Sequence, residues 1–223
     1  MTVRLHVWRV APDRVPAALW RMAADRRRLR RAAGVRFAKL LGTSRGFGPT
    51  RADPTRWAAV TVGAVAPDLA RWDRIAVARC RLDLAPLSSR GTWAGRAPFE
   101  VRSEPVHAGP VLALTRARLR PAKALTFWRA IGPVAAALDG APGLLAAFGI
   151  GEAPVGWQGT VSVWRSSPDL IRFAYRHPQH RQAIARTGTA NWYAEELFAR
   201  FAVVDVHGDT EVIGWVEGRR PPE

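Results

Sequence analysis

Apolar and polar residues alternate over two short stretches of the chain, at 3–10 and again at 111–119. This period-2 pattern predicts two strands, each with one buried face. A segment of about 18 residues with helical periodicity follows each strand. Gly132-Pro133 should kink or split the second helix, because proline removes a backbone donor and clashes with the preceding turn. The apolar stripe of the first helix is Val15, Leu19, Met22, Leu29 and Ala33, and that of the second is Ala124, Trp128, Ile131, Ala135 and Leu138.

Both stretches belong to a longer internal repeat. The segments VTV at 60–62 and PDLARW at 67–72 recur as VSV at 161–163 and PDLIRF at 168–173, in each case 101 residues later. Further upstream the offset rises to 108 or 109, so the first copy carries a longer loop around 46–55. Several matching segments in one order indicate a duplicated structural unit.

Each copy continues with the same kinds of element. A strand is expected at 57–62 and at 157–164, and then a helix opened by Pro67-Asp68 or Pro168-Asp169, with Ser167 as the N-cap of the latter. Closing strands are expected at 77–84 and 198–206, and the segment 192–201 is interpreted as an amphipathic helix that leads into the last strand.

The order β-α-β-β-α-β is that of a ferredoxin-like unit. The sequence therefore predicts an α+β protein with two tandem ferredoxin-like halves, at 1–104 and 105–216, followed by a polar tail at 217–223. Two such halves can pack as a pseudo-dimeric α+β barrel. A ligand site is expected beside or between the two sheets, because small-molecule pockets form between packed units.

Composition adds a strong positive charge to this picture. The net charge is +16, and 32 of the 34 basic residues are arginine. Such a balance favours an acidic partner: nucleic acid, an anionic membrane surface or a carboxylate-bearing cofactor. Nucleic-acid binding is disfavoured, because the arginines are scattered apart from RRRLRR at 26–31. That run spreads around a helix and is read as a solvated face, with contact to an anionic membrane surface as the alternative.

The compartment follows from what the sequence contains. The segment 1–10 has no continuous apolar core, and no later stretch offers eighteen apolar residues without charge. Cys80 is a single cysteine, which excludes an intramolecular disulfide and a multi-cysteine metal site. We expect a cytoplasmic protein, peripheral at the membrane if the arginine run contacts lipid.

Two tracts of the sequence are distinctive, LAPLSSRGTWAGRAPF at 84–99 and the long tract 127–201. The second tract contains GIGE at 149–152, QGT at 158–160, FAY at 173–175, HRQAI at 180–184 and WYAEELFARF at 192–201, and Gly34, Phe37, Lys39-Leu40 and Gly42-Thr43 add to the pattern. Together these residues resemble the spheroidene monooxygenase family, and the resemblance covers most of the chain.

The resemblance implies a fold, a cofactor and a reaction. Members of that family are haem-containing oxygenases with a dimeric α+β barrel fold. They introduce a keto group beside the end of an acyclic carotenoid, using dioxygen and electrons from an external donor. The chain is accordingly expected to bind haem b, with its iron, and to act in carotenoid biosynthesis.

A haem iron needs an axial ligand, for which the sequence offers five histidines and Cys80. The matched HRQAI segment favours His180, with Ala183 and Ile184 one turn further on to direct it inward. His177 is the alternative ligand. The remaining histidines lie on the first strand, in the linker between the halves and in the last turn, and suit surface positions: His6, His107 and His207.

Haem propionates need cations, and arginine binds carboxylates through two parallel hydrogen bonds. The candidates are Arg172, Arg176 and Arg181, and also Arg90 and Arg96. Trp164 and Phe148 are candidates to line the pocket, although most aromatic residues fill cores. A nucleotide fingerprint is not present, because Gly149-Ile150-Gly151-Glu152 lacks the third glycine. Ser88-Ser89 and Glu195-Glu196 form no recognisable triad or dyad.

The prediction is a haem-dependent monooxygenase acting on a hydrophobic small molecule, either carotenoid-like or a natural-product intermediate. This function implies an external electron donor. Assembly of the chain into a homo-oligomer is compatible with the prediction. The alternatives are a haem dehydratase or peroxidase-like enzyme on the same fold, and a non-enzymatic haem or small-ligand binding protein.

Overall fold

A computed structural model describes residues 2–46, 51–101, 107–152, 157–176 and 192–215. Within these residues eight antiparallel strands close into a barrel in the order β1-β3-β2-β6-β7-β5-β8-β4. The first half of the chain forms β1 (Thr2–Val10), α1 (Val15–Arg30), β2 (Val35–Ser44), β3 (Ala52–Gly63), α2 (Ala70–Asp73) and β4 (Ala76–Gly91). The second half forms β5 (Val111–Leu119), α3 (Ala124–Asp139), β6 (Leu144–Gly151), β7 (Trp157–Trp164), α4 (Ser167–Arg176) and β8 (Tyr193–Gly208).

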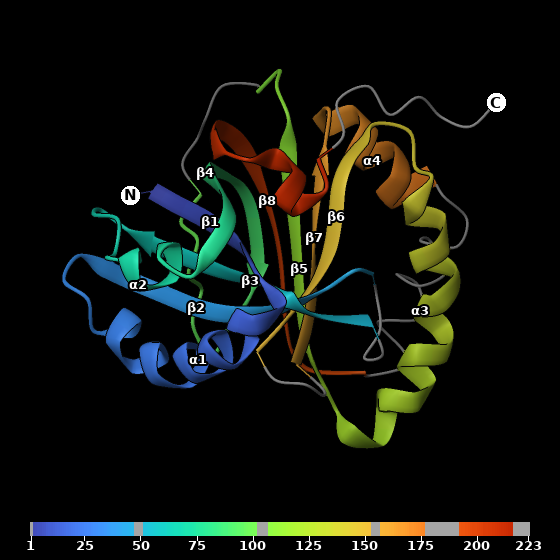
Figure 1. Cartoon of the computed structure of the whole chain (residues 1–223). Coiled ribbons are helices and arrows are strands. Elements are labelled where there is room, and N and C mark those ends of the chain that lie inside the picture. Colours follow the sequence, from blue (N-terminus) through green and yellow to red (C-terminus); the bar gives the residue numbers. More distant parts are fainter. Residues whose placement is uncertain (1, 47–50, 102–106, 153–156, 177–191, 216–223) are drawn as a thin grey trace.

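Each half therefore has the predicted order of elements, and the α+β barrel is confirmed. The two four-stranded sheets join edge to edge through pairs β2–β6 and β4–β8. Helices α1 and α2 lie over the outer face of the first sheet, and α3 and α4 lie over the outer face of the second (Figure 1). The domain boundary after residue 104 and the tail at 217–223 fall outside the described residues and stay predictions.

Apolar side chains fill the inside of the barrel, because every second residue of each strand points inward. They form one cluster that includes Leu5, Leu82, Leu112, Phe148 and Phe201. A 3-10 turn at Thr210–Ile213 closes one mouth with two buried residues, Val212 and Ile213. Trp93 and Phe99, in the segment after β4, belong to the same inner cluster and pack against Phe37 and Phe201.

Two local predictions were wrong, and of the kink or split predicted at Gly132-Pro133 the split is excluded. The segment 192–201 is the start of strand β8 and not a helix, and its alternate residues Leu197, Ala199 and Phe201 enter the inner cluster. The cap of α4 is Ser166 and not Ser167, since the Ser166 hydroxyl accepts a hydrogen bond from Asp169 N–H at 3.3 Å. Gly132-Pro133 does not split α3, which is continuous over Ala124–Asp139.

The buried stripe of α1 also differs from the prediction. Leu19 is exposed, and the buried residues are Ala18, Asp25 and Leu29. Asp25 tolerates its buried position because Arg71 forms an ion pair with it at 3.1 Å. On α3, Leu138 is buried as expected and Ala124 is half-buried. The side chains of Trp128, Ile131 and Ala135 lie outside the described part of the chain.

Candidate functional site

The outer face of the second sheet is made of small and hydroxylated residues beneath α3 and α4. We call five of them the β5–β7 floor: Ala113, Thr115 and Ala117 of β5 with Thr160 and Ser162 of β7. The strand register places Ala113 opposite Ser162 and Thr115 opposite Thr160. The two threonine hydroxyls are hydrogen-bonded at 2.5 Å, so one of them donates to the other across the strands.

Strand β1 of the first sheet carries much larger residues than β5 at the equivalent positions, whereas β3 and β7 carry residues of similar size. Leu112 faces Val163 as Val3 faces Val62, so positions on β1 correspond to positions on β5 109 residues later. Arg4, His6 and Trp8 therefore stand where the floor has Ala113, Thr115 and Ala117, and Ala59 and Thr61 stand where it has Thr160 and Ser162.

Aromatic packing fills the outer face of the first half. The Trp8 ring stacks on Trp72 of α2 with centroids 5.3 Å apart, and Trp57 lies 6.0 Å from Trp72. Trp8 is only 1% exposed and donates through Nε1 to Asp73 at 2.8 Å. By contrast Ala113, Thr115, Ala117 and Thr160 remain half-buried although helices lie over their sheet.

Contacts of α3 with the rest of the second half are described near its two ends, and the side chains of Trp128, Ile131 and Ala135 between them lie outside the described residues. Close to its N-terminus Phe127 packs edge-to-face on Trp192 at 5.7 Å and lies 5.8 Å from Tyr193. Close to its C-terminus Leu138 packs in an outer apolar cluster with Trp164 and Leu170. The floor lies between these two aromatic-rich contacts. This arrangement suits a flat, apolar ligand held between the sheet and the helix.

Residues that are paired across neighbouring strands form rows, and the rows through Ala113 and Thr115 continue across β8 to β4. Ala113 is paired with Arg200, which is paired in turn with Ser88, and Arg200 Nε donates to the Ser88 hydroxyl at 2.9 Å. Thr115 is paired with Phe198, and the Arg90 guanidinium lies 5.1 Å above the Phe198 ring. Cationic groups therefore border an otherwise small and apolar surface.

The structure separates the two aromatic residues predicted to line a pocket. Trp164 lies in the outer cluster at the edge of the floor, with its ring tilted against that of Phe173 at 5.2 Å between centroids, and donates to the Ser162 hydroxyl at 2.9 Å. Phe148 points into the barrel interior, where the Arg56 guanidinium lies 4.9 Å over its ring. The two rings lie on opposite faces of the sheet and do not share one pocket, since neighbouring strand positions alternate in direction.

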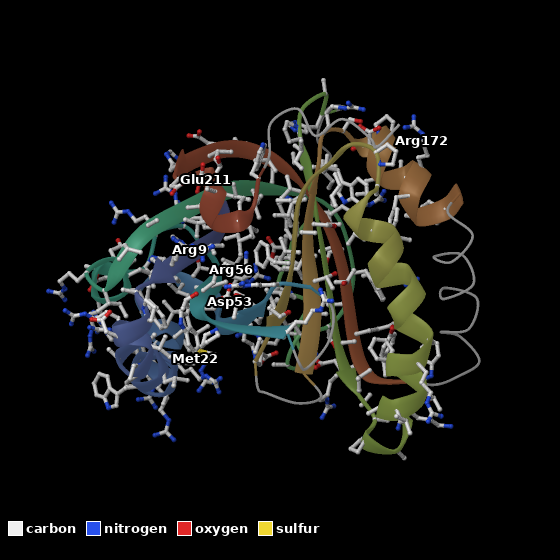
Figure 2. All side chains as sticks on the ribbon, turned by 45° about the vertical axis from the view of Figure 1, so that its right-hand side comes forward. Arg9, Met22, Asp53, Arg56, Arg172 and Glu211 are labelled. Atoms are coloured by element: carbon white, nitrogen blue, oxygen red, sulfur yellow. The ribbon has the colours of Figure 1, made fainter. Side chains whose placement is uncertain are left out.

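The arginines predicted to bind the haem propionates lie in different parts of the structure. Arg172 lies on the outside of α4, and its Nη1 pairs with Asp169 Oδ1 at 3.1 Å (Figure 2). Arg96 is exposed in the turn that closes on Trp93. Arg176 is the last residue of α4, and its side chain is outside the described part. His177, His180 and Arg181 also lie outside the described residues.

The other candidate ligands are placed away from the floor. His6 is not a surface residue: its ring stacks on Trp8 at 5.7 Å, and Nε2 is buried with no partner in the described part of the chain. Burial, followed by Arg81 and Arg4, lowers the pKa of His6 to about 3. His207 faces Asp205 at 3.0 Å on the first-half side of β8, and His107 contacts the Pro110 carbonyl at 3.0 Å.

Cys80 belongs to the barrel interior, where burial raises the pKa of its thiol to about 11. A thiol that keeps its proton is a poor metal ligand. The described residues contain no group of three or more His, Cys, Asp or Glu side chains that could hold a metal ion. None of the described helices combines the length and the apolar character that a membrane span requires.

Sequence reasoning missed a charged network inside the barrel. Arg116, whose side chain is 2% exposed, pairs with Glu195 and, at 3.1 Å, with Glu152. Lys39 binds the other Glu152 oxygen at 2.7 Å, and Trp93 Nε1 donates to Glu152. The network ties β2, β5 and β8 to the segment after β4, so it joins the two halves at one mouth of the barrel.

Hydrogen bonding controls the charge of Glu195 in this network. Burial alone would raise the pKa of Glu195, but donors from Gly95 N–H, Arg116 and Thr92 outweigh it and hold the pKa at about 2. The carboxylate is therefore ionised at neutral pH and satisfied by partners from both halves. Such a network fixes structure and leaves little capacity for chemistry.

A second interior arginine lies nearer the mouth closed by the turn at Thr210–Ile213. Arg56 donates to the Thr43 hydroxyl at 3.1 Å and the Ser44 carbonyl at 2.9 Å, with Asp53 at 3.9 Å. Figure 2 shows Asp53 and Arg56 beside each other. Burial lowers the pKa of Arg56, and Asp53 counteracts it, so the pair stays charged.

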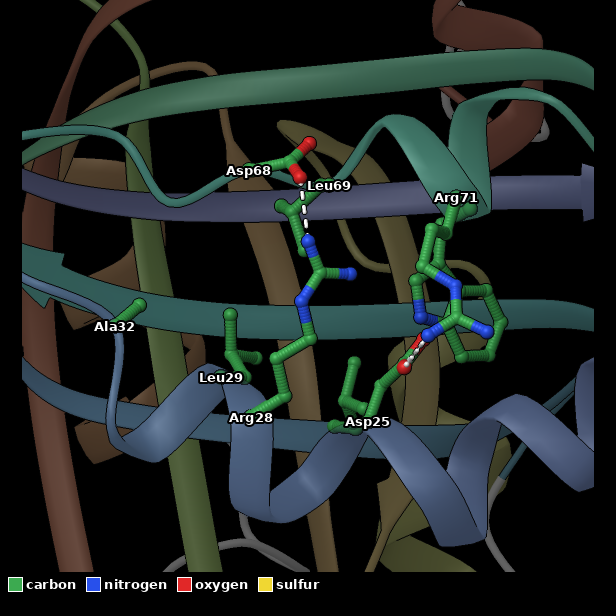
Figure 3. Close-up of a pocket in the computed structure, with 9 residues that line it drawn as sticks. Asp25, Arg28, Leu29, Ala32, Asp68, Leu69 and Arg71 are labelled. Atoms are coloured by element: carbon green, nitrogen blue, oxygen red, sulfur yellow. Dashed lines mark hydrogen bonds and ion pairs between the residues drawn. The ribbon is translucent and has the colours of Figure 1, made fainter.

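A small pocket lies between α1 and the segment around α2, on the outer face of the first half (Figure 3). Two ion pairs cross it, Asp25–Arg71 at 3.1 Å and Arg28–Asp68 at 2.5 Å. Leu29, Leu69 and Trp72 supply apolar walls. Its charged groups are already matched one to one, so it offers little to a cofactor.

The comparisons with known proteins point to one family of enzymes. The chain is 35% identical over 207 residues to spheroidene monooxygenase of Rhodobacter capsulatus, covering 87% of this chain and 86% of that protein. The enzyme of the same name from Rubrivivax gelatinosus is 35% identical over 187 residues, with 78% and 71% covered. That of Cereibacter sphaeroides is 28% identical, with 94% and 69% covered. No family model matches the chain.

Solved structures support the same architecture. An aldoxime dehydratase in complex with butyraldoxime superposes with a TM-score of 0.56 at 11% identity, covering 92% of this chain and 79% of the other. A second aldoxime dehydratase gives a TM-score of 0.51 at 14% identity, with 92% and 81% covered. At these identities the likeness concerns the fold alone.

The fold and the curated relatives together define an oxidoreductase built on a pseudo-dimeric α+β barrel. The chain belongs to the spheroidene monooxygenase family.

Proposed function

We propose that the protein is a haem-dependent monooxygenase of a hydrophobic, carotenoid-like small molecule, with haem b bound between α3 and the β5–β7 floor. The main support for this proposal is the difference between β1 and β5. At equivalent positions β1 has Arg4, His6 and Trp8, and β5 has the smaller residues Ala113, Thr115 and Ala117. On the first outer face the large ring of Trp8 is almost fully buried, and on the equivalent face Ala113, Thr115, Ala117 and Thr160 are small and half-buried.

The residues present fit a porphyrin in size and polarity. Ala113 and Ala117 are about 13 Å apart along an extended strand, comparable to the width of a porphyrin. Trp164 and Phe173 provide apolar rings at one end of the floor, and Trp192 and Phe127 provide them at the other. Cations border the sides. A macrocycle with an apolar face and two carboxylates matches this distribution.

The axial ligand is proposed to be His180, with His177 as the alternative. Both follow α4, whose residues Leu170 and Phe173 pack against the outer cluster beside Trp164. The chain therefore enters 177–191 from the edge of the floor and returns at Trp192, beside α3. Arg172, Arg176 and Arg181 are proposed to lie near the propionates on this side.

The bound iron would supply dioxygen binding and electron transfer from an external donor. The protein's own contribution is positioning and exclusion of water. Thr115 and Thr160 place two hydroxyls at the centre of the floor, where one donates to the other and the second proton is available to a ligand oxygen. Trp164 and Phe173 present apolar rings that favour a hydrocarbon substrate over a charged one.

The test is reconstitution of His180→Ala with haem, measured by the Soret band in the ferric state and in the ferrous state with carbon monoxide. We expect loss or displacement of the band, while His6→Ala and His207→Ala keep the wild-type spectrum. A wild-type spectrum in His180→Ala would transfer the ligand role to His177. A wild-type protein that takes up no haem would overturn the proposal.

The substrate class needs a separate measurement. Oxygen-dependent turnover of an acyclic carotenoid by the reconstituted, chemically reduced protein is expected, with no turnover of a charged amphiphile of similar length. Dehydration of an aldoxime in place of oxygenation would favour the dehydratase alternative. Haem binding without turnover of any apolar substrate would favour a binding protein.

A further inference from the structure

Two arginines on the β8–β4 side of the floor occupy neighbouring positions of the register, and among the described residues neither has an acidic partner. Arg200 is half-buried on β8, and Arg90 is exposed on β4. The register pairs Arg200 with Ser88 and Arg90 with Phe198, so the two guanidiniums stand on adjacent rows of the same outer face. In the described part of the chain neither arginine forms an ion pair with a carboxylate.

Most of the other partly or fully buried cations are compensated. Arg116 has two glutamates, Arg56 has Asp53, Lys39 has Glu152 and Arg71 has Asp25. Two neighbouring cations without a counter-ion repel each other, and one of them has lost part of its water. An anion placed between them would relieve both costs.

Both side chains are held so that their donors remain available. Arg200 uses Nε to bind the Ser88 hydroxyl at 2.9 Å, and among the described residues its two terminal nitrogens have no hydrogen-bond partner. Arg90 lies over the Phe198 ring at 5.1 Å, a contact that orients the guanidinium plane and uses none of its N–H groups. A terminal guanidinium edge matches the two oxygens of a carboxylate.

The acidic groups nearby do not cancel this charge. Glu196 shares the outer face of β8 one row away, paired with Ala117, and forms no ion pair with either arginine among the described contacts. Glu195 is the next residue but points inward to Arg116. The local balance at the floor's edge therefore stays positive.

We propose that Arg90 and Arg200, supported by Phe198 and Ser88, form a carboxylate-binding edge of the floor, and that the carboxylate is a propionate of the bound haem. This inference rests on the proposed function. The main binding site of the propionates is then on the β8–β4 side of the floor and not beside α4. Arg172 is then secondary, because Asp169 already accepts a hydrogen bond from it at 3.1 Å.

The experiment compares haem with haem dimethyl ester, in which both propionates are esterified and uncharged. Soret titrations give a Kd for each ligand with the wild-type chain, Arg200→Gln, Arg90→Gln and the double variant. Arg74→Gln, an exposed arginine of the first half, is the matched control for the change in net charge. Arg90 is exposed, so Arg90→Gln keeps the test open if Arg200→Gln fails to fold.

We expect Arg200→Gln to weaken haem about ten-fold or more, as removal of a charge-assisted hydrogen bond does, and Arg90→Gln to weaken it less. The dimethyl ester should bind the wild-type chain and both variants equally, because the interaction with the carboxylate is already absent. Arg74→Gln should match the wild type for both ligands.

The possible failures are distinguishable. If the wild-type chain binds neither ligand, the proposed function fails and this inference fails with it. If the wild-type chain binds haem and both variants bind it equally well, only the carboxylate edge is overturned. If the variants lose the same factor with haem and with the ester, the arginines shape the site without binding a propionate. A loss confined to a carboxylate-bearing substrate analogue, with haem unaffected, would assign the edge to the substrate.

Discussion

The two halves of the barrel share one architecture but use their outer faces differently. In the first half Trp8, Trp57 and Trp72 fill the space between sheet and helices, and residues of both layers are almost fully buried. In the second half Ala117 takes the place of Trp8, and Thr115 takes the place of His6. If the proposed function holds, the difference teaches that one copy of a duplicated fold can keep small residues on the sheet below its helix, where a ligand is proposed to bind.

This comparison assigns separate tasks to the two copies. The first sheet packs large side chains such as Trp8 against its helices, and the second sheet carries small residues at the equivalent positions of β5, where the cofactor is proposed to bind. Substitutions in the first half should therefore act on the free energy of unfolding, and substitutions on the floor should act on ligand affinity. Exchanging residues between equivalent positions is the direct way to break the comparison.

Truncating the first-half aromatic cluster should give the largest effect. Trp8→Ala removes a buried ring that stacks on Trp72 and donates to Asp73 at 2.8 Å. The cavity and the lost contacts should reduce the free energy of unfolding by about 3–5 kcal/mol. Denaturant titration of the ligand-free chain measures the change. Trp20→Ala, at an exposed position, should cost less than about 1 kcal/mol.

The same variant tests the division of tasks. The folded fraction of Trp8→Ala should bind haem within about two-fold of the wild-type Kd, because the ring faces the first-half helices. If Trp8→Ala weakened haem as strongly as a floor substitution, the two outer faces would not be independent.

Filling the floor should give the next largest effect. Ala117→Trp installs the first-half residue at its equivalent position, where it would occupy the space assigned to the cofactor. Haem affinity should fall at least about a hundred-fold, equivalent to roughly 2.7 kcal/mol, while the ligand-free fold keeps its secondary structure. Ala24→Trp, on the exposed side of α1, is the control and should leave Kd unchanged. Unaltered haem binding by Ala117→Trp would place the cofactor elsewhere.

The strands show which parts of the fold could be predicted from the sequence. The alternation at 3–10 and 111–119 predicted β1 and β5, because a half-buried strand must repeat with period 2. The same rule failed at 192–201, where Ala194, Leu197, Phe198 and Phe201 also follow helical spacing. The segment forms a strand because its backbone pairs with β5 on one side and with β4 on the other. The local spacing of apolar residues contains no information on these distant partners.

The site was less accessible from the sequence. Arg116 and Lys39 look like surface residues, since their partner Glu152 is 36 and 113 positions away along the chain. Their inward direction on alternating strands was the one usable signal. The floor became visible only when strand register aligned the two copies, because a small residue carries no chemistry that marks it as part of a site. Arg200 was missed for the same reason, as its neighbour Ser88 comes from the other half.

The smallest effect should come from protonation of the first-half residue that Thr115 replaces. Burial and two neighbouring arginines lower the pKa of His6 from 6.5 to about 3 in the folded chain. Below pH 6.5 the unfolded chain binds a proton that the folded chain does not, so unfolding becomes easier as the pH falls toward 3. His6→Leu removes this linkage. Its stability relative to the wild type should rise by about 2 kcal/mol between pH 7 and pH 5.

Paired denaturant titrations at the two pH values measure this difference, and carboxylates such as Glu195 titrate in both chains and cancel. An NMR titration of the His6 ring should show no proton uptake above pH 5. A difference between His6→Leu and the wild type that does not change with pH would mean that His6 binds its proton as readily in the folded chain as in the unfolded chain. The first outer face would then accommodate a buried cation beside Arg4 and Arg81, and its contrast with the uncharged pair Thr115–Thr160 would concern charge as well as volume.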